Sequence, residues 1–343
     1  MATLHTITGA TGLVGSHLVL ALLEQQARVR VIARPGSQLK YLQQRLTYYH
    51  QNPEDLLDRI EWREADLLDL PALEAALPGT DILYHCAALV SFDPAHRKAL
   101  EEDNPAMTAN LVNLSLHCGV KRFVHLSSVA ALGRKSGQQH FDENSHWTGS
   151  KDNSSYAIGK YRAELEVWRG FEEGLSGVIL NPCIILGPGR WHEGSGTIFS
   201  RLAKGFPFYS QGVNGFVDVR DVVGAALALA SADKSGERYV VCAENRSYEE
   251  VFKLIAQALK KKEPWIEVKP WMRELAWPVA WLISKFTGQP AFVTRSTAKT
   301  AASKYHYHAD KLKRELNFTF RPVEKTIADV AAFYRSDEER GQI

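Results

Sequence analysis

Tyr156 and Lys160 are spaced so that they can act together on one proton. Side chains four residues apart share a face of a helix, so the Lys160 ammonium can lie near the Tyr156 phenol and favour its ionised form. A free phenol has a pKa of about 10, too high for acid–base catalysis near neutral pH without such help. The spacing therefore predicts a proton-transfer pair on a helix.

A glycine loop stands about 150 residues before this pair, between a strand-like stretch and a helical pattern. In that context Gly9 allows a tight turn, Gly12 lets the backbone approach a pyrophosphate, and Gly15 permits close helix packing. Amides at the start of the helix would face the anion. The loop and the Tyr–Lys pair together predict a nicotinamide cofactor, bound by Gly9, Ala10, Thr11, Gly12, Leu13, Val14 and Gly15.

The end of the second predicted strand favours NADP as that cofactor. NAD-binding loops of this kind usually have an acidic residue about 20 positions later, which bonds the ribose 2′-hydroxyl. This chain has Arg34 there instead, and a guanidinium can pair with a 2′-phosphate through two hydrogen bonds. Ser37 and Lys40 can add contacts to the same phosphate. The alternative is a solvated loop arginine in an NAD enzyme.

Three more candidate positions follow predicted strands, at the edge of the sheet where ligands of α/β folds bind. Asp66 can accept from the adenine amino group while Leu67 covers the ring, although a turn or helix cap explains the aspartate almost as well. Ala87 and Ala88 would let the backbone lie against the cofactor. Ser128 can bond a substrate carbonyl, although serine pairs are also common turn formers.

The elements around these motifs predict an α/β fold. Strands are expected over residues 4–8, 28–33, 60–65, 82–86, 123–126 and 177–180, with few after them. Helices are expected over 12–25, 104–118, 155–172, 197–204, 219–230, 248–260, 272–286, 310–316 and 323–334. This alternation predicts a Rossmann fold, a doubly wound parallel sheet with helices on both faces.

The domain boundaries follow from where the alternation loosens. We expect a dinucleotide-binding core over 1–187 with part of 213–243. A smaller, mostly helical substrate-binding lobe should take up 188–212 and 244–335.

Composition narrows the class of partner. The 343 residues are 45% hydrophobic, and 41 basic and 39 acidic residues give a net charge of +2 with no basic block. This indicates a globular protein with small-molecule partners and no nucleic acid. The start of the chain enters a strand-like stretch at once, which favours the cytoplasm. Neither the four cysteines nor the histidines of the predicted loops, His140, His146, His192, His306 and His308, have the spacing of a metal site.

Several motifs resemble one family, the extended short-chain dehydrogenase/reductases of the NAD-dependent epimerase/dehydratase superfamily. They are the glycine loop, Asp66-Leu67, Asn104 before Thr108-Ala109-Asn110, 119–128, Tyr156–Lys160, Asn181-Pro182, 216–221 and 310–316. The chain is most similar to the dihydroflavonol-reductase-like and 3β-hydroxysteroid-dehydrogenase-like branch.

This resemblance implies roles for the site residues. Tyr156 would be the proton donor, Lys160 would bond the nicotinamide ribose, and Ser128 would polarise the carbonyl. Asn104 would hold a water in a proton relay. Asn181 and Pro182 would lie near the nicotinamide amide.

The expected activity is NADP-dependent reduction of a carbonyl on a hydrophobic small molecule, in a pocket bordered by Val90, Phe92, Trp147, Ile184 and 191–199. One alternative is a sugar-nucleotide epimerase that retains NAD, and another is a non-catalytic NADP-binding sensor or scaffold. Dehydration is disfavoured because residues 129–133 lack the Asp-Glu pair typical of dehydratases. The tryptophan-rich segment 271–286 can touch a membrane, but a packed helix or a homodimer contact is favoured.

Overall fold

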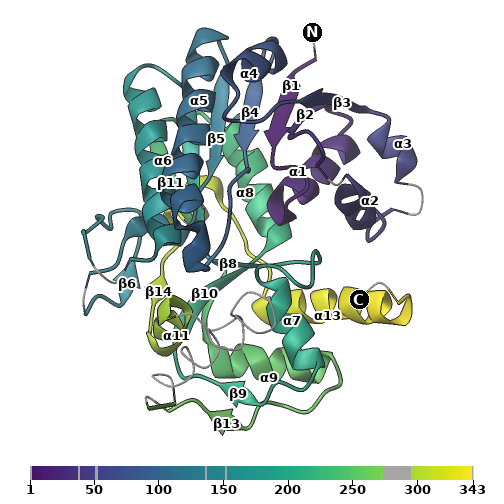
Figure 1. The fold of residues 1–343 in the computed structure, drawn as a ribbon, viewed down its shortest axis with the longest axis vertical. Helices are drawn as coiled ribbons and strands as arrows, with labels where there is room; N and C mark the ends of the chain where they lie inside the picture. Colours follow the sequence, from purple (N-terminus) through teal and green to yellow (C-terminus); the bar gives the residue numbers. More distant parts are fainter. Residues whose placement is uncertain are drawn as a thin grey trace.

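A seven-stranded parallel sheet forms the centre of the protein (Figure 1). The computed structural model describes residues 2–37, 39–50, 53–135, 137–150, 153–269, 271–272, 295–341 and 343. The strand order is β3-β2-β1-β4-β5-β7-β11, which confirms the predicted Rossmann fold. The strands are β1 (Leu4–Thr8), β2 (Arg28–Ala33), β3 (Ile60–Glu64), β4 (Ile82–His85), β5 (Arg122–Leu126), β7 (Gly177–Pro182) and β11 (Glu237–Val241).

Helices cover both faces of this sheet, because its central strands are apolar on both sides. Leu18 of α1 (Leu13–Glu24) and Val222 of α8 (Val219–Ser231) belong to the core on one face. The other core contains residues of α4 (Leu70–Ala76), α5 (Asn104–His117) and α6 (Ser155–Glu172). The short helices α2 (Lys40–Leu46) and α3 (Glu54–Leu57) follow β2.

A second group of elements lies below the sheet in Figure 1. Its helices are α7 (Gly196–Ala203), α9 (Tyr248–Ala258), α11 (Arg295–Ala302) and α13 (Val323–Glu339), whereas α12 (Asp310–Leu316) packs on β11 at the edge of the main sheet. The second group also contains strands that the sequence analysis did not place. These are the three-stranded sheet of β12 (Glu244–Ser247), β10 (Val213–Asp218) and β8 (Ile184–Leu186), and the short pairs β13 (Ile266–Glu267) with β9 (Phe208–Tyr209) and β14 (His306–Tyr307) with β6 (His140–Phe141).

The core of this second group corrects one expectation about the substrate pocket. Trp191 and Phe199 are buried among the side chains of α9 and α13 rather than lining a pocket. The Trp191 indole donates to the fully buried carboxylate of Asp337 at 2.7 Å, which fixes its orientation.

The tryptophan-rich segment can be followed only at its start. The helix predicted over 272–286 lies outside the described residues apart from Met272, and the Trp271 side chain just before it is 66% exposed. Within the described ranges, no helix has the length and apolar run that a bilayer crossing needs.

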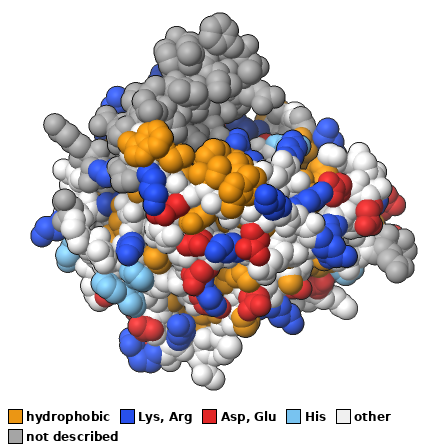
Figure 2. Space-filling view, turned by 90° about the horizontal axis from the view of Figure 1, so that it is seen from below, with side chains coloured by type: hydrophobic (Ala, Val, Ile, Leu, Met, Phe, Trp, Pro, Cys, Tyr) orange, Lys and Arg blue, Asp and Glu red, His pale blue; other side chains and the backbone are white. Residues whose placement is uncertain are grey.

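On the face shown in Figure 2, Lys and Arg side chains are interspersed with Asp and Glu.

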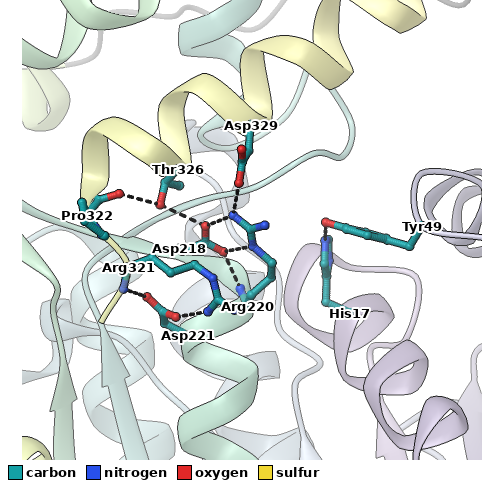
Figure 3. A network of polar contacts seen from close by, with 9 residues as sticks. All are labelled: His17, Tyr49, Asp218, Arg220, Asp221, Arg321, Pro322, Thr326 and Asp329. Carbon is teal, nitrogen blue, oxygen red and sulfur yellow. Dashed lines mark hydrogen bonds and ion pairs between the residues drawn. The ribbon is translucent and has the colours of Figure 1, made fainter. Parts of the chain in front are cut away.

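Polar contacts of Asp218 join the two groups of elements (Figure 3). The carboxylate, at the end of β10, accepts from the Arg220 guanidinium at 2.6 and 2.9 Å and from the Thr326 hydroxyl of α13 at 2.9 Å. Arg220 also pairs with Asp329 of α13 at 2.7 Å. Burial disfavours the charge, but the hydrogen bonds and charge of Arg220, with the Thr326 hydroxyl, outweigh it and hold the pKa of Asp218 below its ordinary value.

We expect Asp218→Asn to lower the free energy of unfolding at pH 7 by about 2 kcal/mol, since hydrogen bonds to charged groups contribute about 1.5–3 kcal/mol. Because the folded pKa is depressed, this contribution is complete above the unfolded pKa of about 4 and is lost as the pH falls through the folded value. Urea unfolding at pH 7 and pH 3 should therefore show a smaller difference between wild type and variant at pH 3. The exposed control Asp58→Asn should change little at either pH; an Asp218→Asn deficit independent of pH would contradict the assignment.

Candidate active site

The glycine loop joins β1 to α1 and leaves the start of that helix uncapped. Gly9 has a φ of +72°, and a Cβ there would lie 2.6 Å from the Ala87 backbone nitrogen. A Cβ on Gly15 would meet the Gly9 carbonyl group, whereas at Gly12 only the Gly9 oxygen lies near, at 3.1 Å. Gly12 is the N-cap and provides no side-chain acceptor. The amides of the first turn are thus suited to a phosphate, and the loop fits a dinucleotide.

Arg45, which the sequence analysis missed, holds this loop from behind. The guanidinium is buried and donates to the carbonyls of Thr11 and Gly12 at 2.7 Å and to the Ser16 hydroxyl at 3.0 Å. Burial lowers the pKa of Arg45 to about 10, with a further contribution from the Arg190 charge. The available signal was its place beside Leu42 and Leu46, on the inward face of α2.

The proposed 2′-phosphate contacts lie together after β2. Arg34 is exposed, and its carbonyl accepts from the Ser37 amide at 3.0 Å, so a tight turn connects the two. Lys40 begins α2, with its ammonium 5.3 Å from the centroid of the Tyr41 ring. The structure leaves the Arg34 side chain accessible to a phosphate, while its role stays a prediction.

The candidate cofactor contacts after β3 (Asp66 and Leu67) and after β4 (Ala87 and Ala88) have different surroundings. Asp66 accepts from the Leu68 amide at 2.9 Å, as a turn former does, and borders a shallow hollow of about 570 Å³. Leu67 is buried, and its side chain packs in the core; its contact with the adenine ring stays a prediction. Ala87 lies against Gly9, with Ala88 next to it.

Tyr156 and Ser128 meet at the carboxyl edge of the sheet. Ser128 follows β5 and caps the 3-10 turn Val129–Leu132, where its hydroxyl accepts from the Ala130 amide at 3.2 Å, and it lies close enough to the Tyr156 phenol to influence the pKa of that phenol. Phe92 lies edge-on to the Tyr156 ring, with centroids 5.6 Å apart. Burial raises the pKa of Tyr156, and the contact with Ser128 opposes that rise only in part.

In this structure Lys160 does not lower the pKa of Tyr156, which is the role that the spacing predicted for it. Its ammonium is buried and donates to the Leu126 carbonyl at 2.9 Å, and the pKa of Tyr156 is raised rather than lowered. Burial also lowers the pKa of Lys160 to about 8, opposed by the negative charge of Glu164. Tyr156 and Lys160 do share helix α6, as the spacing predicted.

The two candidate asparagines are engaged by the protein itself. Asn104 accepts from the Leu89 amide at 2.8 Å and donates to the Leu89 carbonyl at 3.0 Å, which fixes the segment after β4. Its role in holding a water stays a prediction. Asn181 is fully buried and donates to the Ser128 carbonyl at 3.0 Å, and Pro182 beside it ends β7. Asn181 therefore supports the backbone of Ser128, and its place near the nicotinamide amide stays a prediction.

Three histidines that looked scattered in the sequence are stacked in the structure. His140 of β6 lies between His306 and His308, with ring centroids 5.1 and 5.3 Å apart, because β14 pairs with β6. Histidine side chains gather at the left of Figure 2. In the part of the chain that the structure describes, no group of three or more His, Cys, Asp or Glu side chains is arranged to hold a metal ion.

Comparison with known proteins identifies a family model, relatives and a solved structure that this chain resembles. The sequence matches the model of the NAD dependent epimerase/dehydratase family over residues 5–242. The putative dihydroflavonol 4-reductase of Synechocystis sp. is 30% identical over 349 residues, covering 98% of this chain and 96% of that protein. Sterol demethylase protein B of Methylococcus capsulatus is 29% identical over 353 residues, covering 98% and 99%. The crystal structure of gox2253 has a TM-score of 0.79 and 30% identity, covering 97% of this chain and 98% of its own.

Proposed function

This chain belongs to the NAD-dependent epimerase/dehydratase family, and from that premise we propose that it is an NADP-dependent oxidoreductase that reduces a carbonyl on a hydrophobic small molecule. The observation that carries the proposal is the meeting of the Ser128 hydroxyl and the Tyr156 phenol beside the glycine loop's end of the sheet. Two neighbouring hydroxyl groups can both donate hydrogen bonds to a carbonyl oxygen that becomes an alkoxide.

In the proposed reduction, the cofactor supplies the hydride and the protein supplies the proton. When bound, NADPH supplies the hydride that reaches the carbonyl carbon. Ser128 donates a hydrogen bond to the oxygen, and Tyr156 transfers its phenolic proton to that oxygen as negative charge develops there. Burial raises the pKa of Tyr156, so the phenol carries its proton at neutral pH, and the alkoxide that forms is a stronger base than the phenolate and can take that proton.

The apolar surroundings of Tyr156 support a hydrophobic substrate. Phe92 packs on the phenol ring and is still 47% exposed, and Val90 nearby in the sequence is 57% exposed. Exposed apolar side chains beside a reactive group are typical of a site that buries an apolar ligand. The names of the relatives, a dihydroflavonol reductase and a sterol demethylase protein, point to substrates of the same class.

The cofactor decides between the proposed reductase and an epimerase. Purified protein should be denatured, any released nucleotide identified, and the apo form titrated with NADPH and NADH. Exchangeable binding that prefers NADPH supports the proposal and justifies a screen of hydrophobic ketones and aldehydes. Stoichiometric, retained NAD would replace it with internal hydride return, as in epimerisation.

Arg34→Ala should weaken NADPH binding about 10- to 100-fold and NADH binding much less. A charge-assisted hydrogen bond contributes about 1.5–3 kcal/mol, and only NADPH carries the phosphate that Arg34 would hold. Fluorescence titration of both cofactors measures the ratio. Arg28→Ala, on the exposed opposite end of β2, is the matched control and should leave both affinities unchanged. Equal losses for NADPH and NADH in Arg34→Ala would refute the phosphate assignment.

A further inference from the structure

Glu164 is a carboxylate buried directly behind the proposed proton-transfer pair. It lies on α6 one turn after Lys160, and its side chain is 1% exposed. A carboxylate is rarely this deeply buried unless paired, because leaving water is costly for a charge. The four-residue spacing from Lys160 was visible in the sequence, but the burial was not.

The partners of Glu164 come from two different strands. The Asn181 amide of β7 donates to its Oε1, and the same amide nitrogen donates to the Ser128 carbonyl at 3.0 Å. Arg238 of β11 places a guanidinium nitrogen 3.7 Å from its Oε2. One side chain therefore connects α6, β7 and β11 and, through Asn181, the backbone of Ser128.

We propose that Glu164 is a positioning residue for the reductase: it keeps Lys160 protonated and, through Asn181, fixes the backbone that presents the Ser128 hydroxyl to the substrate. The proposal rests on the proposed function, since it assigns a task within the same site. Glu164 itself touches neither substrate nor cofactor.

The charges around Lys160 make Glu164 the group that can hold the ammonium charged. Burial lowers the pKa of Lys160 to about 8, while the charge of Glu164 raises it. Cys86 also faces Lys160, but burial raises the thiol pKa to about 12 and keeps it neutral. His85 and His125 face it from β4 and β5, and burial lowers the pKa of each so that both are neutral near pH 7.

The pKa of Glu164 is raised on balance by burial, and its neighbours oppose that rise in part. Ser127, Arg238, Asn181 and Lys160 all act in the opposite direction to burial. The Arg238 side chain is in turn fixed by hydrogen bonds to the carbonyls of Glu143 and Ser145. Substitution of Glu164 should thus change the charge on Lys160 without a direct contact to any ligand.

Glu164→Gln isolates the charge, because glutamine retains an oxygen for the Asn181 amide. If Lys160 bonds the nicotinamide ribose as an ammonium, cofactor affinity should fall as the pH rises past the lysine pKa. We expect that fall to shift to lower pH by about one unit in Glu164→Gln, with about a fivefold weaker affinity at pH 8. Fluorescence titration of NADPH and NADH from pH 6 to 10 measures it without a known substrate.

Three further variants distinguish an effect of Glu164 on the charge of Lys160 from a merely structural role. Glu164→Asp should retain most of the wild-type pH profile, and it replaces Glu164→Gln if the glutamine variant does not fold. Asn181→Ala should lower kcat without moving the pH profile, because the charge of Glu164 stays. Glu166→Gln removes a half-exposed carboxylate paired with Arg169 on the same helix and should change neither quantity.

The possible outcomes distinguish failure of the role proposed for Glu164 from failure of the proposed function. The role of Glu164 is overturned if folded Glu164→Gln has an unshifted pH profile. It is also overturned if Glu164→Asp loses as much cofactor affinity as Glu164→Gln. In either case the proposed reductase activity stands. If wild-type protein binds neither nucleotide at any pH, the proposed function fails, and the role of Glu164 fails with it.

Discussion

Tyr156→Phe should lower kcat/KM for carbonyl reduction by about 10³-fold, because a positioned general acid contributes about 10²–10⁴. Phenylalanine keeps the ring that packs against Phe92 and removes only the hydroxyl that lies near Ser128. Affinity for NADPH and the melting temperature should therefore stay close to wild type. Steady-state kinetics with a ketone found by screening, together with cofactor titration, measures all three quantities.

Tyr161→Phe is the matched control for this variant. Tyr161 is on the same helix and stacks on Trp147, with centroids 4.2 Å apart, so its phenylalanine variant also keeps a ring and loses a hydroxyl. Activity should stay within about twofold, as for most changes away from the reacting atoms. If Tyr156→Phe were as active as Tyr161→Phe, the proton would have to come from elsewhere and the assignment of Tyr156 would fail.

The elements that carry the site were predictable because local signals mark them. The bounds of β1, β2 and α6 agree with the expected ones. In α6, the Ser154 hydroxyl accepts from the Ala157 amide at 3.2 Å, the capping contact that a serine before a helical pattern predicts. Parallel strands buried on both faces are similarly continuous in apolar residues. Such features depend on neighbours in sequence and can be read from it.

The features that sequence reasoning missed depend on contacts between distant segments. The polar strand β12 exists because β10 provides an antiparallel partner, with Ser247 opposite Val213. Glu164 and Arg45 carry charges into the interior, which composition argues against, and only the partners found there explain them. The same reason accounts for the burial of Leu67, since no local pattern shows whether a residue after a strand packs in the core.

The Rossmann loop should tolerate Gly15→Ala poorly even though alanine is the better helix former. A Cβ at Gly15 would lie 2.8 Å from the Gly9 carbonyl carbon, closer than real Cβ atoms come to backbone atoms, and 3.0 Å from the Ala10 Cα, at the tight end of real contacts. Backbone cannot rotate away as a flexible side chain can, so the loop or helix α1 must shift. Overpacking of this kind costs about 1–3 kcal/mol, and the displaced amides should weaken cofactor binding on the order of 100-fold.

Gly224→Ala tests whether the close packing, rather than the loss of a helical glycine, is responsible. Gly224 lies in α8, and a Cβ there would be 3.6 Å from the nearest Phe318 atom, an ordinary contact. That variant should gain about 0.5–1 kcal/mol and bind cofactor normally. Urea unfolding and cofactor titration of both variants give the comparison. Near-normal cofactor affinity in Gly15→Ala would mean that the amides at the start of α1 do not hold the pyrophosphate, because the predicted displacement acts on those amides first.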